Sequence, residues 1–213
     1  MAAEALDVVA AVEDESLDVE FREDNHTYHV MGVEVPSVTR ILKSITNFGG
    51  IPGHILEKAR IRGQNVHAAV DLYDSGQLNE ETLHPEIAAY LKGYKKFLHE
   101  SAAVVIASEL IVHSPTYKFA GRLDKVFLLR DKYTIVDVKA TAALPKTAGA
   151  QTAAYRQAYE ESSGIRVPNR HVVQLRPNGY TLYPMKDAAD WSLFQSCLNV
   201  WHFNSKFNPR MQQ

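Results

Sequence analysis

The strongest constraint on the fold is a change of periodicity in the middle of the chain. Residues 103–113, 117–129 and 133–139 are rich in apolar and β-branched residues and have the length of strands. Arg130-Asp131-Lys132 is a tight turn between the last two. Helical spacing is expected at 54–74, 84–100, 146–162 and 187–204, and a second hairpin at 170–176 and 179–184. Strands enclosed by helices in this order predict a three-layer α/β domain with a mixed central β-sheet.

The beginning of the chain has a different character. Residues 1–18 are rich in Ala, Val and acids and are expected to form a mobile acidic leader. Residues 19–213 then form a single domain, in which 19–50 hold a β-meander and a short helix and 54–205 hold the core. Ser37, which follows a proline, is expected to cap that short helix.

Charge is unevenly distributed along the 213 residues, although the formal net charge is only −2. The first 20 residues contain seven acids and no Lys or Arg, so residues 21–213 carry 23 basic and 18 acidic residues. A mildly basic body is compatible with a polyanionic substrate, but many enzymes without one carry a similar charge.

Several classes of protein are excluded by what the sequence lacks. The single cysteine, Cys197, cannot form an internal disulfide, a cysteine-only zinc site or an iron–sulfur cluster. No apolar run approaches the roughly 20 residues of a membrane span, so we expect no membrane association and a cytoplasmic location. No phosphate-binding loop of the G-x-x-x-x-G-K-[ST] kind occurs, so we expect no nucleotide cofactor.

Two carboxylates and a lysine are expected on one face of the central sheet. Asp137 and Lys139 lie two residues apart at the end of an apolar strand, so they project to the same side. If Arg130 pairs with Tyr133 across the turn, Asp124 on the preceding strand faces Lys139 directly and Asp137 is its diagonal neighbour. A different loop length would change this register.

This trio has two interpretations. Paired carboxylates offer oxygen ligands to a hard divalent cation such as Mg²⁺ or Mn²⁺, and the lysine could orient or deprotonate an attacking water. The alternative is a cross-strand ion pair at the end of the sheet, because D-x-K is a short pattern.

Further motifs occur in a fixed order around the trio. They are Gly63-Gln64-Asn65-Val66-His67 in a predicted helix, Glu109 in the first central strand, Gly121-Arg122-Leu123-Asp124, Asp137-Val138-Lys139, and Gln151 with Tyr155 in the next helix. Together, over about residues 55–185, they resemble the PD-(D/E)XK nuclease superfamily, and within it the RecB-like branch that includes phage-type exonucleases. The resemblance implies a restriction-endonuclease-like core.

The resemblance also implies a set of site residues. Lys139, Asp124 and Asp137 would be catalytic, and the metal ligands would be His67, Asp124, Asp137 and the carbonyl of Val138. Glu109 could join this metal shell or bind a second ion. The metal would be Mg²⁺ or Mn²⁺, and the single cysteine excludes the iron–sulfur variant of the family. We also expect Gly63, one turn before His67, to let the sheet approach the helix closely.

DNA contacts are implied for Gln151, Tyr155, Arg122 and Lys146. Gln151 and Tyr155 share one helix face, and such a pair is equally typical of ordinary helix packing. Arg166, Arg170 and Arg176, near the second hairpin, are either DNA contacts or solvated side chains.

The implied function is a divalent-metal-dependent deoxyribonuclease, an exonuclease of phage-type recombination or DNA repair. The setting would be the cytoplasm of a bacterium or a phage-infected cell, with DNA as substrate and a single-strand annealing or recombination protein as partner. A structure-specific or restriction-like endonuclease is the alternative within the class. A non-catalytic DNA-binding module on the nuclease fold, or an unrelated α/β protein with accidental motifs, would be alternatives of other classes.

Overall fold

The computed structural model describes residues 19–46, 50 and 52–207. The predicted acidic leader, residues 1–18, lies outside these ranges, as does part of the loop that precedes the first long helix. None of the helices in the described ranges is long and apolar enough to cross a membrane.

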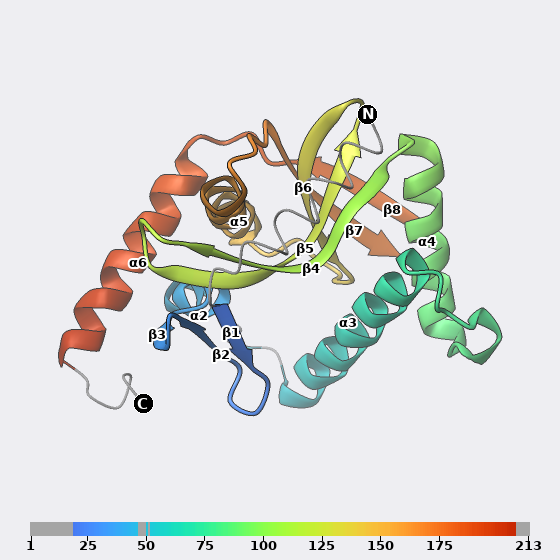
Figure 1. Ribbon diagram of the computed structural model, residues 1–213. Coiled ribbons are helices and arrows are strands. Elements are labelled where there is room, and N and C mark those ends of the chain that lie inside the picture. Colours follow the sequence, from blue (N-terminus) through green and yellow to red (C-terminus); the bar gives the residue numbers. More distant parts are fainter. Residues whose placement is uncertain (1–18, 47–49, 51, 208–213) are drawn as a thin grey trace.

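A mixed sheet forms the centre of the molecule (Figure 1). Within the described residues it has five strands, in the order β4-β5-β6-β7-β8, and only β6 and β7 run parallel. The strands are β4 (Val104–Ser114), β5 (Phe119–Leu129), β6 (Lys132–Lys139), β7 (Asn169–Arg176) and β8 (Gly179–Pro184). The parallel pair requires a crossover, which the helix after β6 provides.

Helices cover both faces of this sheet. On one face lie α3 (Gly53–Asp74) and α4 (Pro85–Ser101), and on the other lie α2 (Val38–Leu42), α5 (Ala148–Ser163) and α6 (Ala189–Phe207) (Figure 1). The short 3₁₀ helices η1 (Lys43–Ile45) and η2 (Glu80–Thr82) lie in connections.

Alternation along the strands divides the core into two parts. Val126 and Ile135 belong to the cluster beneath α5 and α6, whereas Phe127 and Val136 belong to the cluster beneath α3 and α4. Successive strand residues face opposite sides of a sheet, so a strand buried on both faces must be apolar almost throughout. The predicted three-layer α/β fold with a mixed central sheet is confirmed.

A small antiparallel sheet precedes the core. It contains β1 (Val19–Arg22), β2 (Thr27–Val30) and β3 (Val33–Val35), where the sequence indicates a meander. Ser37 caps α2 as expected, because its side chain accepts a hydrogen bond from the Arg40 amide at 3.1 Å. The Ala120 amide donates to the Pro36 carbonyl at 3.0 Å, which joins this segment to β5.

The register of the β5–β6 hairpin differs from the prediction. Leu129 pairs with Lys132 and Lys125 pairs with Val136, so the turn contains only Arg130 and Asp131. Both turn residues have positive φ, 51° and 58°, as a two-residue type I′ turn requires. In this register Asp124 is opposite Asp137, not Lys139. The observed register differs from the predicted one by two residues. Because side-chain orientation along a strand repeats every two residues, Asp124, Asp137 and Lys139 still share one face of the sheet, as predicted.

Candidate metal centre

Three side chains from three elements converge beside the sheet. His67 comes from α3, Glu109 from β4 and Asp124 from β5. The Nδ1 atom of His67 lies 3.9 Å from Glu109 Oε1 and 3.8 Å from Asp124 Oδ2. All three residues are partly buried, and one ligand atom from each lies within 4.8 Å of the others. The residues therefore form a candidate metal site.

Strand pairing brings the two carboxylates together. Ser108 pairs with Lys125 and Leu110 pairs with Leu123, so Glu109 and Asp124 occupy the intervening opposed positions. Glu109 has a φ of 49°, in the left-handed region, although it lies inside a strand. For a residue other than glycine this conformation costs on the order of 1–3 kcal/mol, and such strain is concentrated at functional sites.

The D-x-K segment lies directly beside this cluster. Asp137 is buried, and its Oδ1 and Oδ2 atoms lie 2.9 and 2.8 Å from Nζ of Lys139. The Val138 amide donates a 2.7 Å hydrogen bond to Asp124 Oδ2. Asp124 is thus fixed to β6 by the segment that carries the lysine. Metal ligation by Asp137 and by the Val138 carbonyl stays a prediction.

Negative charge dominates the electrostatics of the site. Burial acts to lower the pKa of His67, but Asp124 and Glu109 outweigh it and raise that pKa to about 9. Burial raises the pKa of Asp137 to about 6, against the opposing effect of Lys139. Burial acts to lower the pKa of Lys139, yet Asp137 and Asp124 raise it. The arrangement therefore favours a positive charge at its centre.

The donor set fits a hard divalent ion. Ligands placed about 2.1 Å from a common Mg²⁺ are roughly 3–4 Å apart, and the distances from His67 Nδ1 to Glu109 and to Asp124 lie in that interval. The carboxylates of Glu109 and Asp124 are the oxygen ligands that Mg²⁺ and Mn²⁺ prefer, and an imidazole shifts the preference toward Mn²⁺.

A cavity of about 240 Å³ opens next to the carboxylates. Gln151 and Tyr155 line it together with Asp124, and the Gln151 amide nitrogen lies 3.4 Å from the Tyr155 hydroxyl. A Cβ atom on Gly121 would lie 2.8 Å from Cε1 of Tyr155. The glycine of the G-x-x-D motif therefore makes room for the tyrosine ring.

The two basic residues that were predicted to contact DNA, Arg122 and Lys146, line different cavities. Arg122 lines this cavity, its NH1 atom lies 3.9 Å from Glu109 Oε2, and its guanidinium lies 4.5 Å from the centre of the Phe21 ring. Lys146 is exposed and lines a different cavity, beside Asp190. The structure thus brings Arg122, but not Lys146, to the candidate site, and contact with DNA stays a prediction for both.

The expectation for Gly63 was wrong. Among the described residues, no atom lies within 4 Å of the Cβ that a side chain there would add. The sheet does not approach α3 closely at this position, because His67, one turn later, spans the distance to the strands.

Sequence reasoning gave no role to residues 1–50, yet part of that segment lines the site. His26, Tyr28, Ser37 and Thr39 contribute to the wall of the same cavity. Tyr28 is only 3% exposed. No local pattern could reveal these contacts, because they join residues that lie far apart in the sequence.

A buried lysine beside Asp124 was also missed. Lys125 is only 1% exposed, and its Nζ atom lies 2.7 Å from Asp74 Oδ2 and 2.8 Å from Ser108 Oγ. It also pairs with Asp71, one helical turn after His67. Its neighbours two residues away, Leu123 and Phe127, are apolar, so a charged residue on an apolar strand face was the available signal.

Comparisons with known proteins give structural matches of low sequence identity. No family model matches the chain, and no curated protein matches it. The alkaline exonuclease LHK-Exo from Laribacter hongkongensis is similar at 14% identity and a TM-score of 0.38, over 83% of this chain and 89% of that one. LHK-Exo in complex with dAMP gives 12% identity and 0.40, over 84% and 90%.

A third solved structure, of the protein SSO0001, is similar at 12% identity and a TM-score of 0.34. That match covers 56% of this chain, and it spans 57% of the length of SSO0001.

Proposed function

We propose that this chain is a divalent-metal-dependent deoxyribonuclease that acts as an exonuclease. One observation carries the proposal: His67, Glu109 and Asp124 converge beside the end of β6, where the buried Asp137 pairs with the partly exposed Lys139. Each motif taken alone is a weak signal. Their convergence is what a metal-dependent hydrolase of phosphodiesters requires.

Three of the proposed ligands already lie close together, and the other two lie beside them. His67, Glu109 and Asp124 would hold the ion, and Asp137 with the Val138 carbonyl would complete its shell. When bound, Mg²⁺ or Mn²⁺ supplies positive charge at the scissile phosphate and lowers the pKa of a bound water. The hydrogen bond from the Val138 amide keeps Asp124 in its ligating orientation.

Lys139 is proposed as the residue that positions the attacking water. Asp137 holds the ammonium group of Lys139. Because the lysine side chain is 18% exposed, the ammonium also remains open to the site. An ammonium there can donate hydrogen bonds to a water or to a phosphate oxygen. Asp137 restricts the lysine to one orientation, which fixes the direction of that donation.

The cavity beside the carboxylates is proposed to receive the DNA backbone. Arg122 offers a cation to a phosphate oxygen, and Gln151 and Tyr155 offer further polar groups in the same cavity. Lys146 would contact the strand farther from the site. The resemblance to phage-type exonucleases supports action from DNA ends, a role in recombination or repair, and a single-strand annealing partner.

A cleavage assay tests the proposal. End-labelled linear DNA and closed-circular DNA are incubated with Mg²⁺, Mn²⁺ or EDTA. We expect degradation of linear DNA alone, with either metal and not with EDTA. Nicking of the circle would select an endonuclease. DNA binding without cleavage in either metal would instead select a non-catalytic binding module.

A further inference from the structure

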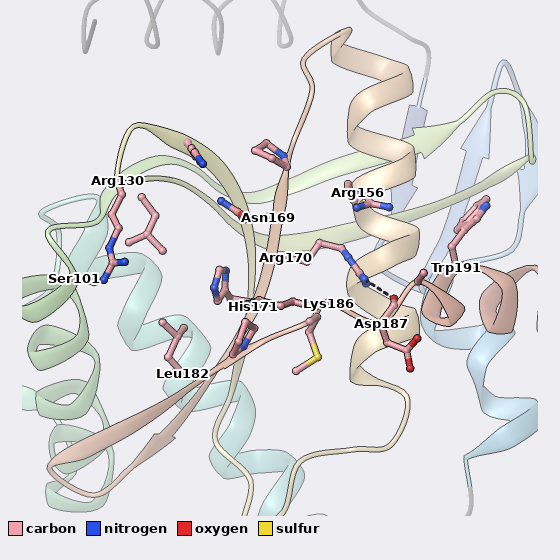
Figure 2. A pocket seen from close by; sticks show the side chains of 16 residues that line it. Ser101, Arg130, Arg156, Asn169, Arg170, His171, Leu182, Lys186, Asp187 and Trp191 are labelled. Atoms are coloured by element: carbon pink, nitrogen blue, oxygen red, sulfur yellow. Dashed lines mark hydrogen bonds between the residues drawn. The ribbon is translucent and has the colours of Figure 1, made fainter.

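A second and larger hollow lies at the other end of the central strands (Figure 2). Its volume is about 880 Å³, and it shares no lining residue with the cavity of the candidate metal centre. Lys132, at the start of β6, lines the hollow, whereas Lys139 ends the same strand at the metal centre. At about 3.3 Å per residue the two ends of β6 are roughly 23 Å apart.

Four basic residues from separate segments surround this hollow. Arg130 belongs to the β5–β6 turn, Lys132 to β6, Arg156 to α5 and Lys186 to the loop after β8. Within residues 19–46, 50 and 52–207, none of their side chains makes a hydrogen bond or an ion pair. Asp187 is the exposed carboxylate on the rim, and its Oδ1 atom accepts from the Ala189 amide. The lining of the hollow therefore contains more cations than carboxylates.

The floor of the hollow is rigidly built. Arg170 is buried and pairs with Asp190 Oδ2 at 3.0 Å. It also donates to the Gly149 carbonyl at 2.8 Å, to Thr152 Oγ1 at 3.3 Å and to the Asp187 carbonyl at 3.2 Å. Arg170, which the sequence left open as a DNA contact, thus fixes α5 and the loop after β8 to the sheet, and Figure 2 shows it within the pocket.

The lining also offers polar and apolar groups. The Nδ1 atom of His171 is buried and has no hydrogen-bond partner among the residues described. Leu182 and Met185 add apolar surface, and Trp191 is held by packing on Tyr117 and Phe194, with ring centres 5.0 and 5.7 Å apart. Cations with aromatic and aliphatic surface between them are the combination that binds the phosphates and bases of single strands.

We propose that this hollow binds a short segment of single-stranded DNA remote from the candidate metal centre, an inference that rests on the proposed nuclease function. Four like charges around one hollow repel one another unless an anion joins them. The four cations come from the β5–β6 turn, β6, α5 and the loop after β8, and this distribution suits the spaced phosphates of a strand better than one phosphate. A strand carries a charge on every nucleotide, and its unstacked bases can lie on the apolar lining. Substrate DNA would then be held at two places at once.

Strand binding without cleavage is the direct test. Binding of a labelled single strand of about 12 nucleotides is measured by fluorescence anisotropy in EDTA, from about 50 to 200 mM salt. The variant Lys132→Glu/Arg156→Glu reverses two charges of the hollow. Lys92→Glu/Lys206→Glu makes the same change at exposed positions on α4 and α6, outside the hollow.

We expect Kd to rise by about tenfold or more at low salt for the hollow variant, with the slope of log K against log salt smaller by roughly 1.4. The matched control should stay within about twofold of the parent, since Lys92 and Lys206 line neither the hollow nor the cavity of the candidate metal centre. Circular dichroism melts verify folding, and Lys132→Ala/Arg156→Ala replaces the reversal if it does not fold.

Any one of four results would overturn the inference. The first is equal weakening in the hollow variant and the control, which would mean general electrostatics. The second is parental affinity in the hollow variant, and the third is the absence of strand binding by the parent. The fourth is displacement of the strand by free dAMP at the same nucleotide concentration, which would make the hollow a mononucleotide site.

A cleavage comparison separates this inference from the proposed function. With Mg²⁺, the hollow variant should cut a trinucleotide at the parental rate, because a trinucleotide is too short to span both the hollow and the metal centre. At low DNA concentration it should cut long strands more slowly than the parent. If the parent cuts neither substrate, the proposed function fails, while the binding series in EDTA still decides the role of the hollow.

Discussion

Single residues at the candidate centre serve both the sheet and the site. Asp124 Oδ2 accepts a hydrogen bond from the Val138 amide and lies 3.8 Å from His67 Nδ1. One carboxylate oxygen therefore links β5, β6 and α3. Substitutions at this scale can separate the binding of metal from the chemistry that follows.

Asp124→Asn should abolish divalent-metal binding and DNA cleavage together. The amide has nearly the size of the carboxylate, but a hard cation needs anionic oxygen. Calorimetric titration with Mn²⁺ and a cleavage time course measure the two effects. Asp131→Asn, at the exposed β5–β6 turn, removes the same charge and should behave as the parent. Parental metal affinity in Asp124→Asn would contradict the ligand role of Asp124 and leave Glu109 as the carboxylate ligand of the cluster.

Lys139→Ala should lose cleavage and keep the metal. It removes no ligand, so the affinity for Mn²⁺ should be unchanged or higher once a neighbouring cation is gone. The cleavage rate should fall by about 10²-fold or more, the usual scale for a positioned proton-transfer group. Normal cleavage in this variant would favour the plain ion pair between Asp137 and Lys139.

Gly121→Ala should destabilise the protein. The added Cβ would lie 2.8 Å from Tyr155 Cε1 and 3.3 Å from Val38 Cγ2, so the free energy of unfolding should fall by about 1–3 kcal/mol. Gly63→Ala has open space and lies inside α3, where alanine should add up to about 1 kcal/mol. Urea unfolding of both variants checks the opposite signs, and equal effects would contradict the account of Gly121.

At the scale of elements, local patterns predict the strands better than their pairing. The bounds of β5 and β6 follow from apolar runs, but the register depends on the turn. Arg130 and Asp131 both adopt left-handed conformations without the Asn-Gly or Gly-Gly signature of a type I′ turn, so the two-residue turn was not recognised. The shared face of Asp124 and Asp137 was predictable because strand parity survives a shift of two.

The conformation of Glu109 shows where prediction from sequence ends. Its neighbours are those of an ordinary strand, and nothing local indicates a φ of 49°. A strained residue is maintained by the surrounding structure, so it becomes visible only once β4, β5 and α3 are assembled.

Lys125→Met should be strongly destabilising, because α3 is tied to the sheet by this buried charge. The substitution leaves Asp74, 5% exposed, without its cation, and breaking a buried pair costs about 3–5 kcal/mol. Adding Asp74→Asn should recover part of that loss. A double-mutant cycle in urea measures the coupling. Additive effects of the two substitutions would mean that the pair does not hold α3.

At the scale of the whole molecule, the N-terminal sheet forms part of the candidate site. Tyr28 and Ser37 line the cavity, and the bond from the Ala120 amide to the Pro36 carbonyl anchors the segment beside Gly121. Sequence analysis could not assign this role, because contacts between segments about 100 residues apart leave no periodic signal.

Phe21→Ala tests whether this sheet shapes substrate binding. The Phe21 ring lies 4.5 Å from the guanidinium carbon of Arg122, a cation–π contact worth about 0.5–1 kcal/mol at an exposed site. Its loss frees Arg122 to leave the cavity, so KM for linear DNA should rise several-fold while kcat stays near the parental value. In the parent protein, Arg122 would hold a phosphate equally well in the ground state and in the transition state. Loss of a contact that is equal in both states raises KM and leaves kcat unchanged.

Two further variants make this last prediction decisive. Phe21→Trp keeps an aromatic face and should retain the parental KM. Met31→Ala shortens an 80% exposed side chain next to β2 of the same sheet, away from Arg122. It should change neither KM nor kcat. A fall in kcat for Phe21→Ala at unchanged KM would instead mean that Arg122 acts in the transition state. If KM and kcat are both unchanged in Phe21→Ala, the N-terminal sheet does not contribute to substrate binding, and its contact with β5 contributes only to stability.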